Sequence, residues 1–403
     1  MIAKMLTLSL VMPCEAMLTP RRLAARANAP RIAAGGYHTC TIRADNELAE
    51  CWGAGGPDSD YSFPDYGQSN VDPPNVPYTN ISAGRVHTCA LRVDNSRGIA
   101  ECWGSNSNGQ SNVSPNVPYT RISAGYEYTC GIREDNSRAE CWGNNDYGQT
   151  TVSPNVPYTQ ISAGGFHTCG IRADNSRAEC WGRNDVGQST VSPNVEYTHI
   201  SAGGHHTCGI RSDNSLAECW GAGKPSDPTN NLPHYGQSTV SPNWPYTHVS
   251  AGFWHTCGIR ADNSLAECWG SNDDGQRTVS PNVPYTQISA GHGHTCGIRS
   301  DNSLAECWGS NEYGRSTVLS PPSPPPSPPS QPPYPPFPPP DPSAPSSLDT
   351  GEKDSMVLLV VIIAAALVVL VVLGMAALFY CKVIRKTTEP VVKTPAAGTT
   401  QAV

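Results

Sequence analysis

ISAGGFHTCGIRADNSRAECWGRNDVGQSTVSPNVEYTH, residues 161–199, is a unit that recurs along most of the chain. The next copy begins 39 residues later. Seven copies follow one another, with first cysteines at Cys40, Cys89, Cys130, Cys169, Cys208, Cys257 and Cys296. A period near 40 residues, with a Trp-Gly step and glycine-rich turns, is typical of a β-propeller or a solenoid. We therefore expect an all-β repeat domain over residues 29–319.

Each copy contains two short runs that predict an antiparallel hairpin. In the fourth copy, HTCGIR and RAECWG flank a turn-forming Asp-Asn-Ser cluster,. Cys169 and Cys180 are symmetric about this turn and therefore face each other. A four-residue loop at 173–176 puts them at a non-hydrogen-bonded pair, where Cα atoms lie ~4.5 Å apart and a disulfide fits. A two-residue loop would instead place the two cysteines at a hydrogen-bonded pair, and we favour the longer loop.

The cysteine count agrees with one disulfide in each copy. Of 16 cysteines, Cys14 lies in the predicted leader and Cys381 at the cytoplasmic edge, which leaves two for each copy. Each crosslink closes about 12 residues, worth roughly 2.5 to 3 kcal/mol. A zinc site at His167, Cys169 and Cys180 is the alternative, but it offers only three ligands in each copy. We predict no metal and the pairs Cys40–Cys51, Cys89–Cys102, Cys130–Cys141, Cys169–Cys180, Cys208–Cys219, Cys257–Cys268 and Cys296–Cys307.

One hydrophobic segment predicts a membrane-spanning helix. Residues 356–380 are 25 residues without a charge, against the ~20 needed to cross ~30 Å of hydrocarbon,. Lys382, Arg385 and Lys386 follow directly, so the positive-inside rule places residues 381–403 in the cytoplasm and the repeats outside,. A tail this short holds no folded domain, so any signal passes to a separate cytoplasmic partner.

The first 28 residues predict a signal peptide or leader. A lysine, a short apolar stretch and the small residue Ala16 favour secretion, as do the many cysteines,. Four arginines between residues 21 and 31 would also suit an organelle transit peptide, which remains the alternative,. With the secretory interpretation, the chain is a type I single-pass protein of the plasma membrane.

Residues 320–347 predict a Pro-rich stalk, followed by a juxtamembrane segment at 348–355. Polyproline II rises ~3.1 Å per residue, so the stalk reaches roughly 85 Å when extended. Its Ser-Pro-Pro runs resemble the hydroxyproline-rich glycoproteins of plant and green-algal walls, which implies hydroxylation and O-glycosylation. Asn80-Ile-Ser and Asn112-Val-Ser add two acceptor sequences for N-linked glycans,.

The copies resemble the regulator of chromosome condensation repeat. AGGFHTC matches that family's Gly-Gly-x-x-His step, and CWGRNDVGQ matches its Trp-Gly-x-Asn-x-x-Gly-Gln loop. The resemblance covers residues 29–318 and implies a seven-bladed propeller. The layout is also similar to the ectodomain of crinkly-type plant receptor kinases, which carry seven cysteine-containing repeats outside the membrane. We expect that layout here without the kinase.

The protein after which the repeat family is named binds chromatin and exchanges guanine nucleotide, and we expect neither activity in this chain. A net charge of −8, from 26 basic and 34 acidic side chains, argues against a surface that neutralises nucleic-acid phosphates,. Guanine-nucleotide exchange is the least favoured of the alternatives. Outside the repeated residues we find no nucleophile with a base, no phosphate loop and no carboxylate pair. We therefore expect neither an enzyme nor a cofactor.

Variation between otherwise similar copies indicates where a ligand binds. Arg172, Glu179 and Trp181 have equivalents in every copy, and His167 in all but the third, which has Tyr128. We interpret these residues as structural. The two positions before the histidine vary and are rich in aromatic residues, which are enriched at binding hot spots. We predict a ligand-binding ring of Tyr37, Tyr126, Phe166, His205, Phe253, Trp254 and His292, with the inserted loops at 53–68 and 221–237 as the second candidate,.

These observations predict a cell-surface protein whose extracellular propeller binds a protein or glycan ligand. The alternative is a structural cell-wall or adhesion glycoprotein in which the stalk dominates.

Overall fold

The computed structural model describes residues 31–56, 66–94, 97–223, 235–240 and 244–318. The predicted leader, stalk, juxtamembrane segment, membrane helix and cytoplasmic tail lie outside these residues. Within the described ranges, no helix is both long and apolar enough to cross a bilayer. The described residues cover the seven repeats, and the fold below is that of the repeats alone.

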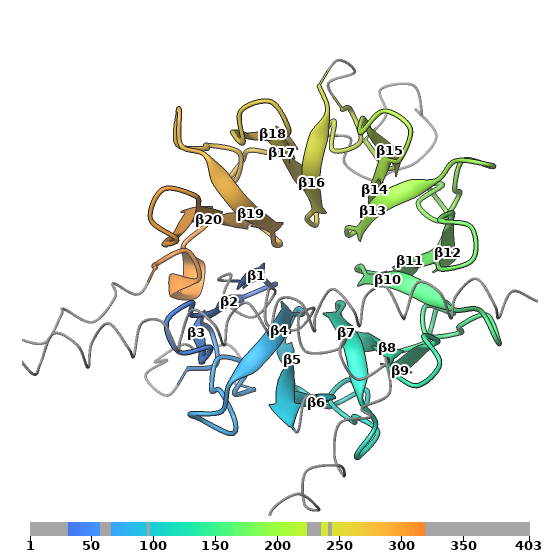
Figure 1. Ribbon diagram of the computed structural model, residues 1–403. Helices are drawn as coiled ribbons and strands as arrows, with labels where there is room; N and C mark the ends of the chain where they lie inside the picture. The colour runs from blue at the N-terminus through green and yellow to red at the C-terminus, as the bar shows by residue number, and fades with distance from the viewer. Residues whose placement is uncertain (1–30, 57–65, 95–96, 224–234, 241–243, 319–403) are drawn as a thin grey trace, which may run out of the picture. The chain divides into compact units, whose positions relative to one another are not determined.

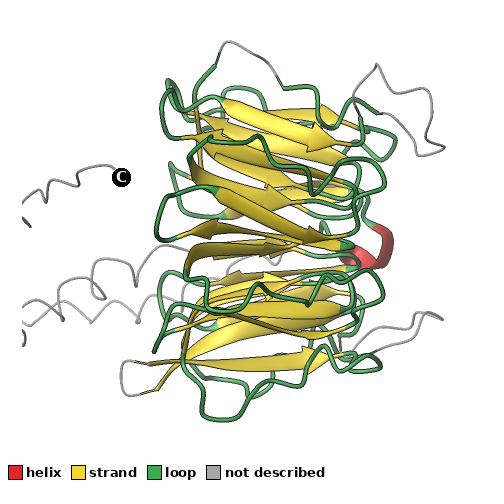
Figure 2. Cartoon of the chain, turned by 90° about the vertical axis from the view of Figure 1, so that its right-hand side faces the viewer, coloured by secondary structure: helices red, strands yellow, loops and turns green. Residues whose placement is uncertain are grey.

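Seven three-stranded antiparallel sheets surround a central channel (Figure 1). Each repeat forms one sheet, and its strands follow chain order from the channel outward. The seven-bladed propeller implied by the repeat is confirmed. In side view the strands run between two loop-covered faces (Figure 2).

The strands nearest the channel are β1 (Arg31–Ala34), β4 (Tyr78–Ala83), β7 (Tyr119–Ala124), β10 (Tyr158–Ala163), β13 (Tyr197–Ala202), β16 (Tyr246–Ala251) and β19 (Tyr285–Ala290). The middle strands are β2 (His38–Ile42), β5 (His87–Asp94), β8 (Tyr128–Arg133), β11 (His167–Arg172), β14 (His206–Arg211), β17 (His255–Arg260) and β20 (His294–Arg299). The outer strands are β3 (Ala49–Gly53), β6 (Arg97–Gly104), β9 (Ala139–Gly143), β12 (Ala178–Gly182), β15 (Ala217–Gly221), β18 (Ala266–Gly270) and β21 (Ala305–Gly309). A short 3-10 helix, η2 (Glu312–Gly314), follows β21.

The middle and outer strands form the predicted hairpin, with Cys169 opposite Cys180. All seven predicted disulfides are present, and the Cα atoms of each pair are 4.1 Å apart, as a non-hydrogen-bonded pair requires,. The Arg172 amide donates to the Arg177 carbonyl at 2.9 Å, which closes the expected four-residue loop at 173–176. The Arg172 carbonyl accepts from the Ser176 amide at 3.1 Å, where Ser176 has a left-handed backbone with φ 58°. The register, and hence the cysteine pairing, is as predicted.

The channel strand of each sheet was not predicted from the sequence. In the fourth sheet it begins at Tyr158, whose side chain is buried between two blades. A Cβ atom on Gly170 would lie 2.6 Å from the Tyr158 ring, so glycine is required there. The Tyr158 hydroxyl donates to Glu179 at 3.0 Å, and Arg172 pairs with the same carboxylate at 3.3 Å. Arg172 and Glu179 are therefore structural, as interpreted from the sequence.

Hydrogen bonds from one blade to the next hold the ring together. Trp181 Nε1 donates to the Gln149 carbonyl of the preceding Gly-Gln loop at 2.9 Å. His167 Nε2 lies 2.7 Å from Thr207 Oγ1 of the next blade. The same contacts close the ring, since His294 bonds Thr39 at 2.7 Å. The histidine and tryptophan of the repeat thus join neighbouring blades.

Candidate functional site

A closed ring of backbone hydrogen bonds surrounds one mouth of the channel. It lies where each channel strand turns into the middle strand. The first residue of each variable pair donates its amide to a glycine carbonyl of the next blade, as Gly165 does to Gly203 at 2.9 Å. The seven bonds are 2.9 to 3.2 Å long, and His292 closes the circle on Gly35. These bonds use only backbone atoms, so four of the seven positions carry four different large side chains while the bond is kept. At the glycines the space is tight, since a Cβ atom on Gly204 would lie 2.8 Å from the Phe253 carbonyl oxygen.

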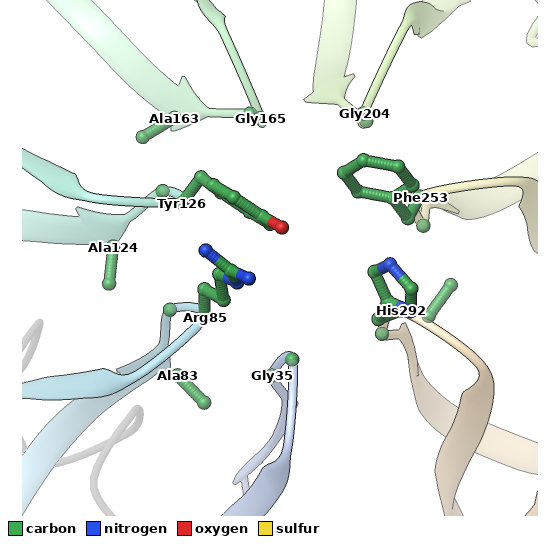
Figure 3. A pocket seen from close by; sticks show the side chains of 18 of the residues that line it. Gly35, Ala83, Arg85, Ala124, Tyr126, Ala163, Gly165, Gly204, Phe253 and His292 are labelled. Carbon is green, nitrogen blue, oxygen red and sulfur yellow. The ribbon is translucent and has the colours of Figure 1, made fainter. Parts of the chain in front are cut away.

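Four of the seven first positions carry large side chains over the channel (Figure 3). Arg85 and Tyr126 lie on one side, with the guanidinium 4.2 Å from the ring centroid. Phe253 and His292 lie on the other side, with their ring centroids 4.5 Å apart. Tyr126 and Phe253 approach to 5.7 Å across the channel. These side chains cover a cavity of about 100 Å³ whose remaining lining is alanine and glycine.

The second positions extend this group outward into a continuous aromatic cluster. The Phe166 ring lies 5.5 Å from Tyr126 and 5.3 Å from His205. His205 stacks on Trp254 at 5.1 Å, and Trp254 contacts Phe253 at 4.8 Å. The structure therefore brings six of the seven predicted ring residues into one cluster.

The seventh predicted residue, Tyr37, lies beside the cluster. Arg85 Nη2 donates to its hydroxyl at 3.4 Å, and its ring contacts Tyr313 at 5.8 Å. Arg85 also pairs with Glu127 at 3.2 Å, so its charge is compensated. Burial lowers the pKa of His205 to about 4, so this side chain is neutral at pH 7.

A third set of residues lies on this face and was not among those predicted from the sequence. They directly precede the Gly of each Gly-Gln step, or of Gly-Arg in the last copy. Tyr147 contacts Phe166 at 5.6 Å, and Tyr235 contacts Trp254 at 5.9 Å. The signal was available, because this position varies between copies while the glycine after it does not. The set comprises Tyr66, Asn108, Tyr147, Val186, Tyr235, Asp274 and Tyr313.

We call these three sets of residues together the aromatic face. Its outermost tyrosines are well exposed, with 42% of Tyr66, 47% of Tyr147 and 40% of Tyr235 open to solvent. The inserted loops begin on the same face, where the Ala54 amide donates to the Tyr37 carbonyl and the Ala222 amide donates to the His205 carbonyl, both at 2.9 Å. They end on it at Tyr66 and Tyr235. Residues 57–65 and 224–234 of these loops lie outside the described residues.

The chemistry of the aromatic face suits binding. Aromatic rings and neutral histidines offer stacking and apolar contacts. Two arginines lie over these rings, and each pairs with an acidic side chain: Arg85 with Glu127 and Arg183 with Asp185. Among the described residues, no group of three or more His, Cys, Asp or Glu side chains is placed to hold a metal ion. His167 and its equivalents are buried in the bonds between blades.

The two predicted glycosylation sites lie in different surroundings. Asn112 is exposed in a loop, where its side chain accepts a hydrogen bond from Asn106. Asn80 lies within β4, and its Oδ1 is buried. Asn112 is therefore the better placed of the two for a glycan.

Comparisons with known proteins agree with this architecture. The family pattern described as "Regulator of chromosome condensation (RCC1) repeat" matches residues 119–149, 158–188, 246–276 and 285–315. No curated protein matches the chain by sequence.

Solved structures share the propeller. The entire ectodomain of the Physcomitrella patens receptor kinase CR4 is similar at 27% identity and a TM-score of 0.56, over 70% of this chain and 74% of that one. The CRINKLY WD40 ectodomain of the Arabidopsis thaliana receptor kinase ACR4 is similar at 22% identity and a TM-score of 0.56, over 72% and 98%. Human WBSCR16 is similar at 15% identity and a TM-score of 0.52, over 67% and 86%. The last two show the fold alone.

Proposed function

Because the chain carries RCC1-family repeats, we propose that it uses them as an extracellular binding module on a single-pass cell-surface protein. The ligand is a protein or a glycan, and the aromatic face is the binding surface. The disulfide in each blade supports an oxidising compartment,. The likeness to the ectodomain of a receptor kinase also supports a position outside the cell. The uncharged segment at 356–380 would provide the anchor and the Pro-rich segment the stalk,.

The observation that carries this proposal is the aromatic face itself. Seven blades hold their variable residues at one end of the channel on a closed backbone ring. Tyr, Trp and Phe are the residue types enriched at binding hot spots, and here they form one connected cluster with partly exposed tyrosines around it,. A rigid aromatic surface loses little conformational entropy when a ligand binds. We propose that the chain binds its ligand and does not catalyse a reaction.

Binding arrays with variants of the aromatic face test this proposal. The secreted segment 29–319 is applied to carbohydrate and protein arrays to identify a saturable partner. Replacing Tyr147 and Tyr235 with Ala should weaken binding about 30-fold, which is about 2 kcal/mol, without loss of folding. Both side chains are exposed, so their removal leaves the core intact. Phe253→Ala with Trp254→Ala tests the inner part of the same face.

Trp244→Ala is the matched control. This tryptophan is also exposed, at 41%, but its ring packs on Arg260, at the far end of β17 from the aromatic face. Its removal should leave binding unchanged. If the tyrosine variants bind as tightly as the parent, the aromatic face is not the ligand site. If only the stalk binds wall components, the protein is a structural glycoprotein.

A further inference from the structure

Among the described residues, six of the seven grooves between neighbouring blades contain side chains of the segment that connects those blades. In the groove before the fifth blade, Val191 and Val195 of the connection pack against Ile171 and Trp220. The connection then enters β13 at Tyr197, whose amide donates to the Ser176 carbonyl at 2.8 Å.

The glutamate of the outer strand is bonded in the same way in these six blades. A tyrosine hydroxyl donates to it at 2.8 to 3.1 Å in every one: Glu101, Glu140, Glu179, Glu218, Glu267 and Glu306. In four of them a serine hydroxyl from the connection also donates, as Ser192 does to Glu218. The Val-Ser-Pro-Asn segment and the tyrosine after it are thus the normal contents of a groove.

The seventh groove, between the last blade and the first, lacks these contents among the described residues. A cavity of about 290 Å³ lies there, lined by Glu50 and Trp52 of the first blade and by Ile298, Asn302 and Val318. Among the residues that the structure describes, only Arg43 donates a hydrogen bond to the Glu50 side chain. Leu304 is 44% exposed, whereas its equivalents Leu216 and Leu265 each pair with a proline of a connection. We call this cavity the seam groove.

The sequence explains why the seam groove differs. The position of Tyr158 is Ala29 in the first copy, so no tyrosine is available. Thr41 replaces the glycine on which that tyrosine lies in five other blades, and its hydroxyl donates to the Arg31 carbonyl at 2.7 Å. The seam groove is therefore open to a segment with a different shape.

The chain itself leads into this groove. Val318 lines the cavity and corresponds to Val191, which begins the filled part of the fifth groove. The chain continues Leu319-Ser320-Pro321-Pro322, so a Ser-Pro step follows here as it does in the connections, one residue later. Proline-rich segments dock on aromatic-lined grooves in a preformed polyproline II conformation, and Trp52 supplies such a surface,.

We propose that the seam groove is a docking site for the start of this chain's own Pro-rich segment, with the Ser320 hydroxyl donating to Glu50. The groove holds Asp45 and Asn302, which lie in the turns at the ends of β2 and β20 away from the aromatic face. The seam groove therefore lies at the end of the blades opposite the aromatic face.

Photo-crosslinking of the full chain tests the occupant. The photo-reactive amino acid p-benzoylphenylalanine replaces Asn302 in the seam groove, and crosslinked peptides are mapped by mass spectrometry. The control carries it at Asn175, the equivalent position in a filled groove, and should link to residues 191–197. We expect the seam probe to link to residues 319–334 of the same molecule. Glu50→Gln should lower that yield roughly fivefold, because a neutral amide oxygen accepts the Ser320 hydroxyl less strongly than a carboxylate does. Glu179→Gln should leave it unchanged.

Other crosslinks would overturn the proposal. A link to residues 1–30 would assign the groove to the start of the chain. A link between isotopically light and heavy chains would assign it to a second copy. No link at the seam, while the Asn175 control reacts, would show that the groove is empty in solution.

Discussion

Replacing one buried histidine with tyrosine should make the propeller less sensitive to acid, because the chain then takes up about one proton fewer when it unfolds at low pH. His167 lies fully buried between blades, and burial lowers its pKa from 6.5 to about 3. Burial lowers the pKa of the equivalents His38, His87, His206, His255 and His294 in the same direction. The third copy shows the replacement, because Tyr128 occupies this place and donates to the His167 carbonyl at 2.6 Å. His167→Tyr therefore introduces into the fourth copy the residue that the third copy has at the same position.

The sign follows from which state binds the proton. The folded pKa lies below the unfolded value of about 6.5, so the unfolded chain takes up protons first as the pH falls,. Stability is full above about pH 6.5 and is lost from there toward pH 3. At pH 5.5 each buried histidine costs about 1.4 kcal/mol. Six together cost about 8 kcal/mol, a large part of the ~5 to 15 kcal/mol that stabilises a typical domain.

Urea unfolding at pH 7.5 and pH 5.5, followed by tryptophan fluorescence without reductant, measures the effect. The loss of unfolding free energy between the two pH values should be about 1.4 kcal/mol smaller for His167→Tyr than for the parent. Tyr128→His is the reverse control and should enlarge the loss by the same amount. The comparison is independent of any change in stability at pH 7.5. If both variants lose as much stability as the parent, these histidines do not govern the acid sensitivity.

Three further predictions concern the blades and the topology. Trp269→Ala removes a buried ring and its hydrogen bond to the Gln237 carbonyl, so urea unfolding should show a loss of about 3 to 5 kcal/mol,. Replacing Cys169 and Cys180 together with Ala should lower the free energy of unfolding by about 2 to 3 kcal/mol,. Mass mapping of the non-reduced parent should show every disulfide within its own repeat. Free thiols across the set would contradict the secretory interpretation. An antibody against residues 381–403 should label intact cells only after permeabilisation, and labelling of unpermeabilised cells would reverse the proposed orientation.

The parts of the fold that depend on local spacing were predictable from the sequence alone. The repeat gave the number of blades, and the symmetric placement of Cys169 and Cys180 about one turn gave the disulfide register. Side chains in a strand alternate with a period of two, so a loop length determines which residues face each other. The variable pair before the histidine could be placed on one face for a related reason, because equivalent positions of a ring lie at the same end of every blade.

The tertiary structure decided what joins residues distant in sequence. Tyr147 contacts Phe166 within one face although the two belong to different strand connections, and His294 meets Thr39 across 255 residues. The seam groove also depends on the tertiary structure, because the cavity beside Glu50 lies between the last blade and the first. Local pattern determines how each blade forms, since its bonds lie within about 40 residues. The aromatic face and the seam groove arise from packing between blades, which the pattern of a single repeat does not contain.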